Sequence, residues 1–228
     1  MRRTALPRLL VCPIRGSGTP LDAMTVLFLT TMMPGGRVTG SEVVSSTFIE
    51  AIRKAGHRAV VIAYRRIGSG LKIEEDEVCV ADRHIETRGA GLRPYWWMAA
   101  GFALRLPYSL AKYRSRRYRR GLASALRRFR PELIVVDHAQ MAWAVPPDLE
   151  LPVVYLAHNV EHQLYAQASQ RSRWPMSWVN GREARQIESV ERQLVRRASQ
   201  VWALSRNDAD AFELLGSATP PTILARRS

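Results

Sequence analysis

Apolar residues along the chain form short continuous runs, separated by segments in which they recur at helical spacing. Such runs are typical of strands buried on both faces of a parallel sheet. The five clearest runs begin near Thr25, Arg58, Leu133, Val153 and Gln200, and a further run extends from Glu77 to Ile85. The pattern predicts an α/β fold, a Rossmann-like parallel sheet with helices on both faces.

A glycine-rich turn joins the first two runs. It contains Gly35, Gly36 and Gly40, and Ser41 then opens a segment of helical periodicity that ends at Gly56. Glycines let a backbone approach a ligand closely, and a helix N-terminus attracts phosphate. The spacing matches neither a dinucleotide-binding fingerprint nor a P-loop. A turn that merely joins strand and helix therefore remains the alternative.

Polar clusters follow two later strands, Asp137-His138 after one and His158-Asn159-Val160-Glu161-His162 after the other. In a parallel sheet these ends converge with the glycine turn on one crevice. A histidine such as His158 could donate a hydrogen bond to a phosphate or sugar hydroxyl, or act as a general acid or base. In the simpler interpretation, His138 caps a helix and His162 is exposed.

A metal site formed by His158, Glu161 and His162 is not expected, because no further carboxylate or cysteine has suitable spacing. The sequence also contains neither a nucleophile elbow nor a reactive cysteine environment, so hydrolase chemistry has no support. We expect no metal and no other cofactor.

One segment makes the protein basic. Of the formal net charge of +14, most comes from 12 Lys/Arg between Thr87 and Pro131, where there is no acid. The segment carries Trp96 and Trp97, followed by a basic helix expected from Tyr108 that includes Arg116, Arg117, Arg119 and Arg120. Either this is an ordinary helix with a solvated face, or it faces an anionic membrane or an acceptor. No RNA-binding motif occurs, so nucleic acid is not an expected partner.

The chain organisation predicts one main domain. Residues 1–23 show no sustained period, and Met24 directly precedes the first strand, so we expect a disordered extension or a misread start. We expect residues 24–216 to form the domain and residues 217–228 to be a truncated linker. With two cysteines and no disulfide framework, a reducing compartment is expected, which indicates a cytoplasmic protein. If the basic segment faces a membrane, the protein would be peripheral on its inner face.

Several motifs together resemble the N-terminal domain of family-4, GT-B-type glycosyltransferases. They are Leu-Thr-Thr-Met-Met-Pro-Gly-Gly, Arg-Pro-Glu-Leu-Ile-Val-Val-Asp-His, Leu-Ala-His-Asn-Val-Glu and Glu-Arg-Gln-Leu-Val-Arg-Arg-Ala-Ser-Gln-Val-Trp-Ala-Leu-Ser. They occur in the family's order between about Thr25 and Gly216. Weak motifs in the right order are more specific than any one of them.

The resemblance implies the acceptor-side half of a retaining enzyme that uses a nucleotide-sugar donor and a glycan or lipid-linked acceptor. Gly35, Gly36, Gly40 and Ser41 would lie against the donor diphosphate, and His158 near the transferred sugar as the catalytic residue. The other expected crevice residues are Asp137, His138, Asn159 and Glu161. The family's second, donor-binding domain is not recognisable here, so the chain is expected to be inactive alone. The alternative is a non-catalytic module that binds a membrane surface or an anionic partner.

Overall fold

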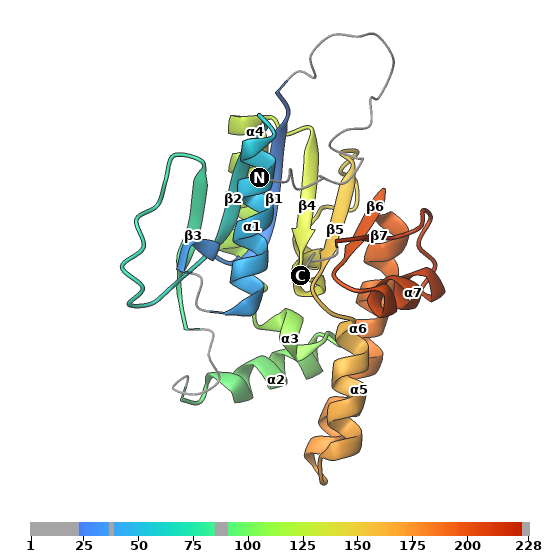
Figure 1. The fold of residues 1–228 in the computed structure, drawn as a ribbon. Coiled ribbons are helices and arrows are strands. Elements are labelled where there is room, and N and C mark those ends of the chain that lie inside the picture. Colours follow the sequence, from blue (N-terminus) through green and yellow to red (C-terminus); the bar gives the residue numbers. More distant parts are fainter. Residues whose placement is uncertain (1–22, 37–38, 85–90, 225–228) are drawn as a thin grey trace.

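A parallel sheet lies at the centre of the computed structural model, which describes residues 23–36, 39–84 and 91–224 (Figure 1). Across the sheet the order is β3-β2-β1-β4-β5-β6-β7, and every neighbouring pair is parallel. The strands are β1 (Thr25–Met32), β2 (Arg58–Arg66), β3 (Glu77–Arg83), β4 (Leu133–Asp137), β5 (Val153–Ala157), β6 (Gln200–Ala203) and β7 (Thr222–Ile223). The predicted α/β fold is confirmed, and the five clearest strands begin at the predicted residues.

Helices cover both faces of this sheet. They are α1 (Gly40–Lys54), α2 (Arg93–Ala103), α3 (Tyr108–Ala111), α4 (Arg116–Phe129), α5 (Glu161–Arg171), α6 (Met176–Arg197) and α7 (Arg206–Leu214), with 3-10 turns η1 (Pro34–Gly36) and η2 (Ala139–Ala144). On one face, α1 buries Ile49 and Ile52 against the sheet. On the other, α4, α6 and α7 bury Leu122, Ile187 and Phe212. Alternate residues of each strand thus enter two separate cores.

The first helix begins one residue earlier than the sequence suggested. Thr39 is its N-cap, since its hydroxyl accepts a hydrogen bond from the amide of Glu42 at 3.3 Å. Gly56 follows the helix with φ 87°, the left-handed conformation expected of a residue at this position. The βαβ unit therefore has the predicted form and delivers the N-terminus of α1 to the carboxyl edge of the sheet.

The basic helix expected from Tyr108 is two helices, α3 and α4. Ser115 separates them: its backbone is extended, with φ −154°, and its hydroxyl accepts from the amide of Tyr118 at 3.0 Å. The hydroxyl of Tyr64, on β2, bonds both the Ser115 hydroxyl and the carbonyl of Tyr113, each at 2.7 Å. These contacts with β2 stabilise the interruption between α3 and α4. Because Tyr64 is distant in sequence, the helical periodicity on both sides of Ser115 could not predict this interruption.

The longest helix, α6, carries two glutamates with fully buried side chains. Glu183 accepts hydrogen bonds from the amides of Tyr108 and Ser109 at 2.8 and 3.0 Å, at the start of α3. Glu191 accepts from the amides of Glu161 and His162 at 2.8 and 3.1 Å, at the start of α5. Each carboxylate thus satisfies helix amides that lack intrahelical partners, in the favourable direction of the helix dipole.

The end of the domain departs from the expected boundary. Residues 217–228 were expected to be a linker, but Thr222 and Ile223 pair with Trp202 and Ala203 as β7. The side-chain amide of Gln200 donates to the Thr222 hydroxyl at 2.9 Å and stabilises this short edge strand. The extension predicted for residues 1–23 lies almost entirely outside the described residues. Within the described ranges, no helix is long and apolar enough to cross a membrane.

Candidate functional site

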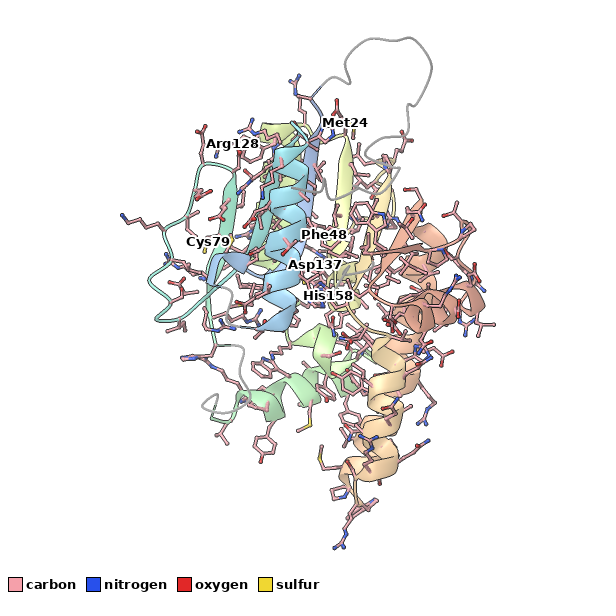
Figure 2. The ribbon with its side chains drawn as sticks, viewed as in Figure 1. Met24, Phe48, Cys79, Arg128, Asp137 and His158 are labelled. Atoms are coloured by element: carbon pink, nitrogen blue, oxygen red, sulfur yellow. The ribbon has the colours of Figure 1, made fainter. Side chains whose placement is uncertain are left out.

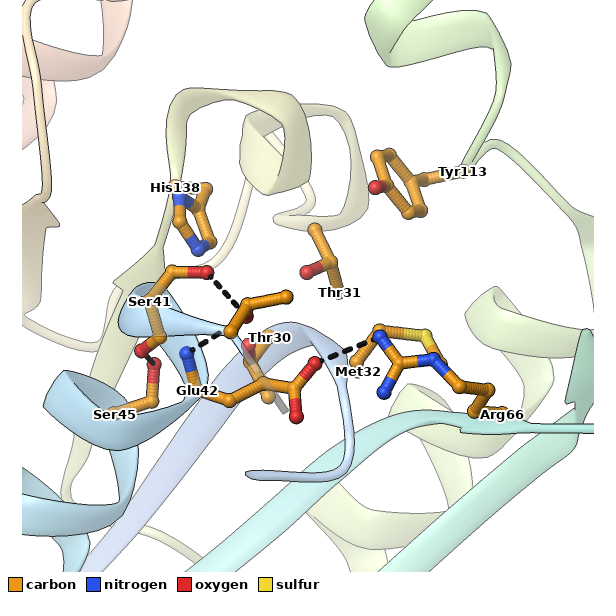
Figure 3. Close-up of a pocket in the computed structure, with 10 residues that line it drawn as sticks. Thr30, Thr31, Met32, Ser41, Glu42, Ser45, Arg66, Tyr113 and His138 are labelled. Carbon is orange, nitrogen blue, oxygen red and sulfur yellow. Dashed lines mark hydrogen bonds and ion pairs between the residues drawn. The ribbon is translucent and has the colours of Figure 1, made fainter. Parts of the chain in front are cut away.

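A small polar pocket opens where β1 and β4 end and α1 begins (Figure 3). Its volume is about 110 Å³. Hydroxyl groups dominate the lining, which consists of Thr30, Thr31, Met32, Thr39, Ser41, Glu42, Ser45, Arg66, Tyr113 and His138. The carboxylate of Glu42 holds the guanidinium of Arg66 at 2.9 Å across one side. The pocket therefore offers several donors and acceptors at the edge where open α/β sheets bind ligands.

A buried hydrogen bond between an aspartate and a histidine lies beside this pocket, and both residues are labelled in Figure 2. The carboxylate of Asp137, at the end of β4, accepts from Nε2 of His158 at 2.5 Å and from the hydroxyl of Ser45 at 2.7 Å. Burial raises the pKa of Asp137, but the neighbouring His138 and His158 and the hydrogen bonds outweigh it and lower that pKa to about 2. Asp137 is thus an anion that fixes the orientation of His158.

His158 is buried and does not line the pocket, whereas His138 does. The ring of His138 stacks on that of His158 with centroids 4.1 Å apart, and the His138 backbone has φ 73°. Burial lowers the pKa of His138 to about 4; the Asp137 carboxylate opposes this shift and His158 adds to it. The ring is therefore neutral near pH 7. Its role as the N-cap of η2 is a backbone role, since its side chain makes no capping hydrogen bond.

The glycine turn is anchored by hydrogen bonds of the two residues before it, and its glycines are exposed. The Pro34 carbonyl accepts from the Ser46 hydroxyl at 2.8 Å, and the Met33 amide donates to the carbonyl of Tyr64 at 2.8 Å. Gly35 and Gly36 lie exposed in η1. A Cβ atom built on Gly40 would meet no described atom within 4 Å. Packing among the described residues therefore does not require glycine at position 40.

The remaining predicted site residues lie apart from the pocket. Asn159 is exposed beyond β5, and Glu161 begins α5, where burial raises its pKa although a hydrogen bond from Gln140 opposes the shift. Neither lines the pocket. His162, expected to be exposed, is partly buried and bonds Glu191 through Nδ1 at 2.7 Å. His158 precedes α5, so it does not share a helix face with Glu161 and His162.

A different trio, Asp137, His138 and His158, brings ligand-type atoms within 4.8 Å of one another. Both oxygens of Asp137 already accept hydrogen bonds, one of them from His158 itself. The two imidazole rings also stack nearly parallel, at 19°. A metal would have to break these contacts, so we interpret the trio as a hydrogen-bonded cluster.

The tryptophans and arginines of the basic segment lie on different elements. Trp96 is exposed on α2, whereas Trp97 is partly buried beneath the ammonium of Lys112 at 5.2 Å. The four arginines singled out earlier lie exposed in the first turns of α4: Arg116, Arg117, Arg119 and Arg120. α4 begins beside the carboxyl ends of β1 and β2, where Ser115 bonds Tyr64, and it ends close to the start of β4. These arginines therefore lie at the end of α4 that is nearer the crevice edge.

Sequence reasoning missed several residues of the site. Ser45 contacts Asp137 across 92 positions of sequence, and Arg66 reaches Glu42 across 24. Ser45 and Ser46 could have been noticed, because they fall on the inward face of an otherwise apolar helix stripe. Thr30 also bonds Asp137, and no local pattern distinguishes it from an ordinary strand residue.

Two similarities relate the chain to known proteins. A family model described as a glycosyl transferase 4-like domain matches residues 39–225. Among solved structures, a sucrose-phosphate synthase from Thermosynechococcus elongatus is similar with a TM-score of 0.51 and 11% sequence identity. That similarity covers 89% of this chain and 47% of the synthase chain, so this chain spans about half of its structural neighbour. No curated protein matches the sequence.

The structural similarity supports the fold alone, because its sequence identity is low. The family match covers most of the chain, from the N-cap of α1 to just beyond β7. It includes the end of β4, the end of β5 and the helix that caps α3 and α5. The resemblance inferred from the sequence motifs is confirmed, and the chain belongs to the glycosyl transferase 4-like domain family.

Proposed function

We propose that this chain forms the acceptor-side half of a retaining glycosyltransferase. The enzyme would move a sugar from a nucleotide-sugar donor to a glycan or lipid-linked acceptor. The observation that carries the proposal is the hydroxyl-lined pocket at the N-terminus of α1, beside the Asp137–His158 pair. Hydroxyls, a guanidinium and free helix amides are the groups that bind phosphate and sugar oxygens.

The glycine turn would accommodate the donor diphosphate. Gly40 and Ser41 occupy the first turn of α1, where amides lack intrahelical partners and the helix dipole favours negative charge. The open space above Gly40 leaves room for a phosphate to approach the backbone. Gly35 and Gly36 would border the same group from η1.

His158 would contact the transferred sugar or its phosphate. A carboxylate can only accept, so Nε2 of His158 donates to Asp137 and carries a proton. This leaves Nδ1 for the substrate: unprotonated, it accepts from a sugar hydroxyl, and protonated, it donates to a phosphate oxygen. Asp137, with both oxygens engaged, would act as a positioning residue and not contact the substrate.

The chain alone would bind the donor weakly and would not transfer sugar. Glycosyl transfer needs the anomeric carbon held against the acceptor and the diphosphate charge balanced, and positioning supplies much of the acceleration. With groups on one side only, the donor would stay hydrated and its electrostatic contacts would be weak. We propose that a second domain supplies the opposite wall and the nucleotide contacts. No metal is part of the proposal.

The site can be tested without catalysis. Isothermal titration of the chain with a panel of nucleoside-diphosphate sugars should show weak binding to at least one member. Gly40→Val should abolish this binding, because its side chain would fill the space proposed for the phosphate. Ala123→Val, at an exposed position of α4, is the matched control and should bind like the original chain. Equal binding by both variants would place the donor elsewhere.

Transfer itself can be tested by joining a family-type donor domain after Leu224, beyond β7. The fusion should transfer sugar, and His158→Ala should reduce its kcat. Turnover by the 228-residue chain alone would contradict the proposal that transfer needs a second domain. A chain that binds none of the donors, alone or fused, would favour the alternative of a non-catalytic module with the same fold.

A further inference from the structure

Exposed apolar side chains gather at one end of the molecule. Among the described residues, 12 large apolar side chains are exposed, and 9 of them belong to two segments. We call these nine the aromatic platform: Leu92, Tyr95, Trp96, Phe102, Leu104, Leu164, Trp174, Met176 and Trp178. The first five lie in or beside α2. Trp174, Met176 and Trp178 lie at the tip of the α5–α6 hairpin, and Leu164 lies in the first turn of α5. Both regions extend beyond the carboxyl edge of the sheet (Figure 1).

The outer face of α2 is apolar at helical spacing. Positions 92, 95, 96, 99, 102 and 103 are all exposed and carry Leu, Tyr, Trp, Ala, Phe and Ala. The opposite face is also apolar and packs inward through Trp97, Met98 and Gly101. A surface helix of a globular protein has a polar outer face, and one that is apolar all round is normally covered. Something outside the described chain is therefore expected to cover α2.

The two halves of the platform are fixed to each other. The rings of Phe102 and Trp178 stack with centroids 5.5 Å apart at an angle of 11°. Arg182 lies over the Phe102 ring at 4.1 Å and donates to the Gly101 carbonyl at 3.0 Å. A Cβ on Gly101 would approach Leu106 and Tyr108 to 3.0 Å, so glycine allows α2 to pack closely on α3. The platform is thus a defined surface that the fold holds together.

Its charges have one sign. No aspartate or glutamate occurs between residues 87 and 131, or between residues 162 and 182. The exposed charged residues beside the apolar groups are arginines: Arg93 and Arg105 next to α2, and Arg171 and Arg173 at the hairpin tip. Tryptophan and tyrosine favour the boundary between lipid headgroups and hydrocarbon, and arginines near an anionic leaflet each contribute on the order of 1 kcal/mol.

We propose that the aromatic platform docks on an anionic lipid surface. α2 would lie in the interface with its outer face among the acyl chains, and the hairpin tip would insert Trp174, its most exposed tryptophan. The charge complementarity distinguishes this occupant from a second copy of the chain, which would bring arginines against arginines. The surface differs from the arginine-rich segment singled out by sequence, because it includes α5–α6 and excludes α4.

Vesicle binding tests the proposal without any glycosyltransferase activity. The 228-residue chain should co-sediment with vesicles of phosphatidylcholine and phosphatidylglycerol, and far less with phosphatidylcholine alone. The double variant Trp96→Ser, Trp174→Ser should bind at least tenfold more weakly. Leu214→Ser is the matched control: Leu214 is 87% exposed, but on α7, outside the platform. It should bind like the original chain. Brominated lipid should quench tryptophan fluorescence in the control and not in the double variant.

A second pair of variants separates the charge contribution. Arg171→Gln with Arg173→Gln should reduce binding at low salt and leave little difference at high salt. Three results would overturn the proposal. These are absence of binding to anionic vesicles, equal binding by the tryptophan double variant, and self-association in sedimentation velocity that the double variant abolishes while vesicles stay unbound. The last result would assign the platform to a second copy of the chain.

Discussion

The crevice, which comprises the polar pocket and the Asp137–His158 pair, lies at the same end of the sheet as the aromatic platform. The two regions differ in which side chains they bury and which they expose. In the crevice, ionisable groups are buried and find partners within the chain, as Asp137 does with His158 and Ser45. On the platform, apolar groups are exposed, and only Phe102 and Trp178 contact each other as a ring pair. Removing one partner of a buried charged hydrogen bond is costly, whereas an exposed ring contributes little to folding. Changes in the two regions should therefore have different consequences for the free energy of unfolding.

The largest effect is expected from Asp137→Ala. It leaves the buried His158 ring and the Ser45 hydroxyl without their acceptor, and such a loss typically costs about 3 kcal/mol or more. Chemical denaturation should show this decrease in the free energy of unfolding. Asp82→Ala is the control, because Asp82 pairs with Arg65 on the surface at 2.6 Å, where solvent screens the interaction, and its loss should be much smaller. Similar losses for the two variants would contradict the contrast between buried and exposed charge.

A pH-dependent effect of intermediate size is expected from His138→Gln. The pKa of His138 is about 4 in the folded protein and near 6.5 when unfolded, so between these values the unfolded state binds more protons. Stability contributed by the neutral ring is therefore lost as the pH falls from 6.5 to 4, by on the order of 2 to 3 kcal/mol. The variant should lose less stability over this range. An unchanged pH profile would show that His138 titrates normally.

The smallest effect on stability is expected on the platform. Trp174→Ser removes a side chain that is 82% exposed, so the free energy of unfolding should change by less than about 0.5 kcal/mol. Thermal unfolding of the chain without lipid gives the comparison with Asp137→Ala. A large decrease in the free energy of unfolding would mean that Trp174 packs against the rest of the protein and is not available to bind a partner.

The sheet was predictable because buried parallel strands are continuous apolar runs. Residues 133–137 and 153–157 are wholly buried, and both strands begin where the apolar run does. Ser205 likewise caps α7, accepting from the Asp208 amide at 3.1 Å, and a serine three residues before an aspartate is a local capping pattern. These features depend on neighbouring residues, so local periodicity and capping patterns are sufficient to identify them.

The parts that escaped prediction depend on distant contacts. α5 buries none of its residues completely, and its first amides bond Glu191 from another helix. β7 has two residues and exists through its pairing with β6. In the site, the end of β4 and the end of β5 were predicted to meet. Ser45, which bonds Asp137 from α1, is 92 positions away in sequence, and only its place on the inward face of the helix could have indicated it.

The two buried glutamates of α6 set a limit on how this domain can change in length. Glu183 and Glu191 are eight residues apart on α6. The carboxylate of Glu183 must point toward the start of α3, and that of Glu191 toward the start of α5. One residue inserted between them would turn one carboxylate by about 100° and shift it by about 1.5 Å relative to the other. One of the caps would then be lost and a buried charge left without its amides. Surface loops such as residues 67–76 tolerate insertions far better, so natural length variation should be found there and not between positions 183 and 191.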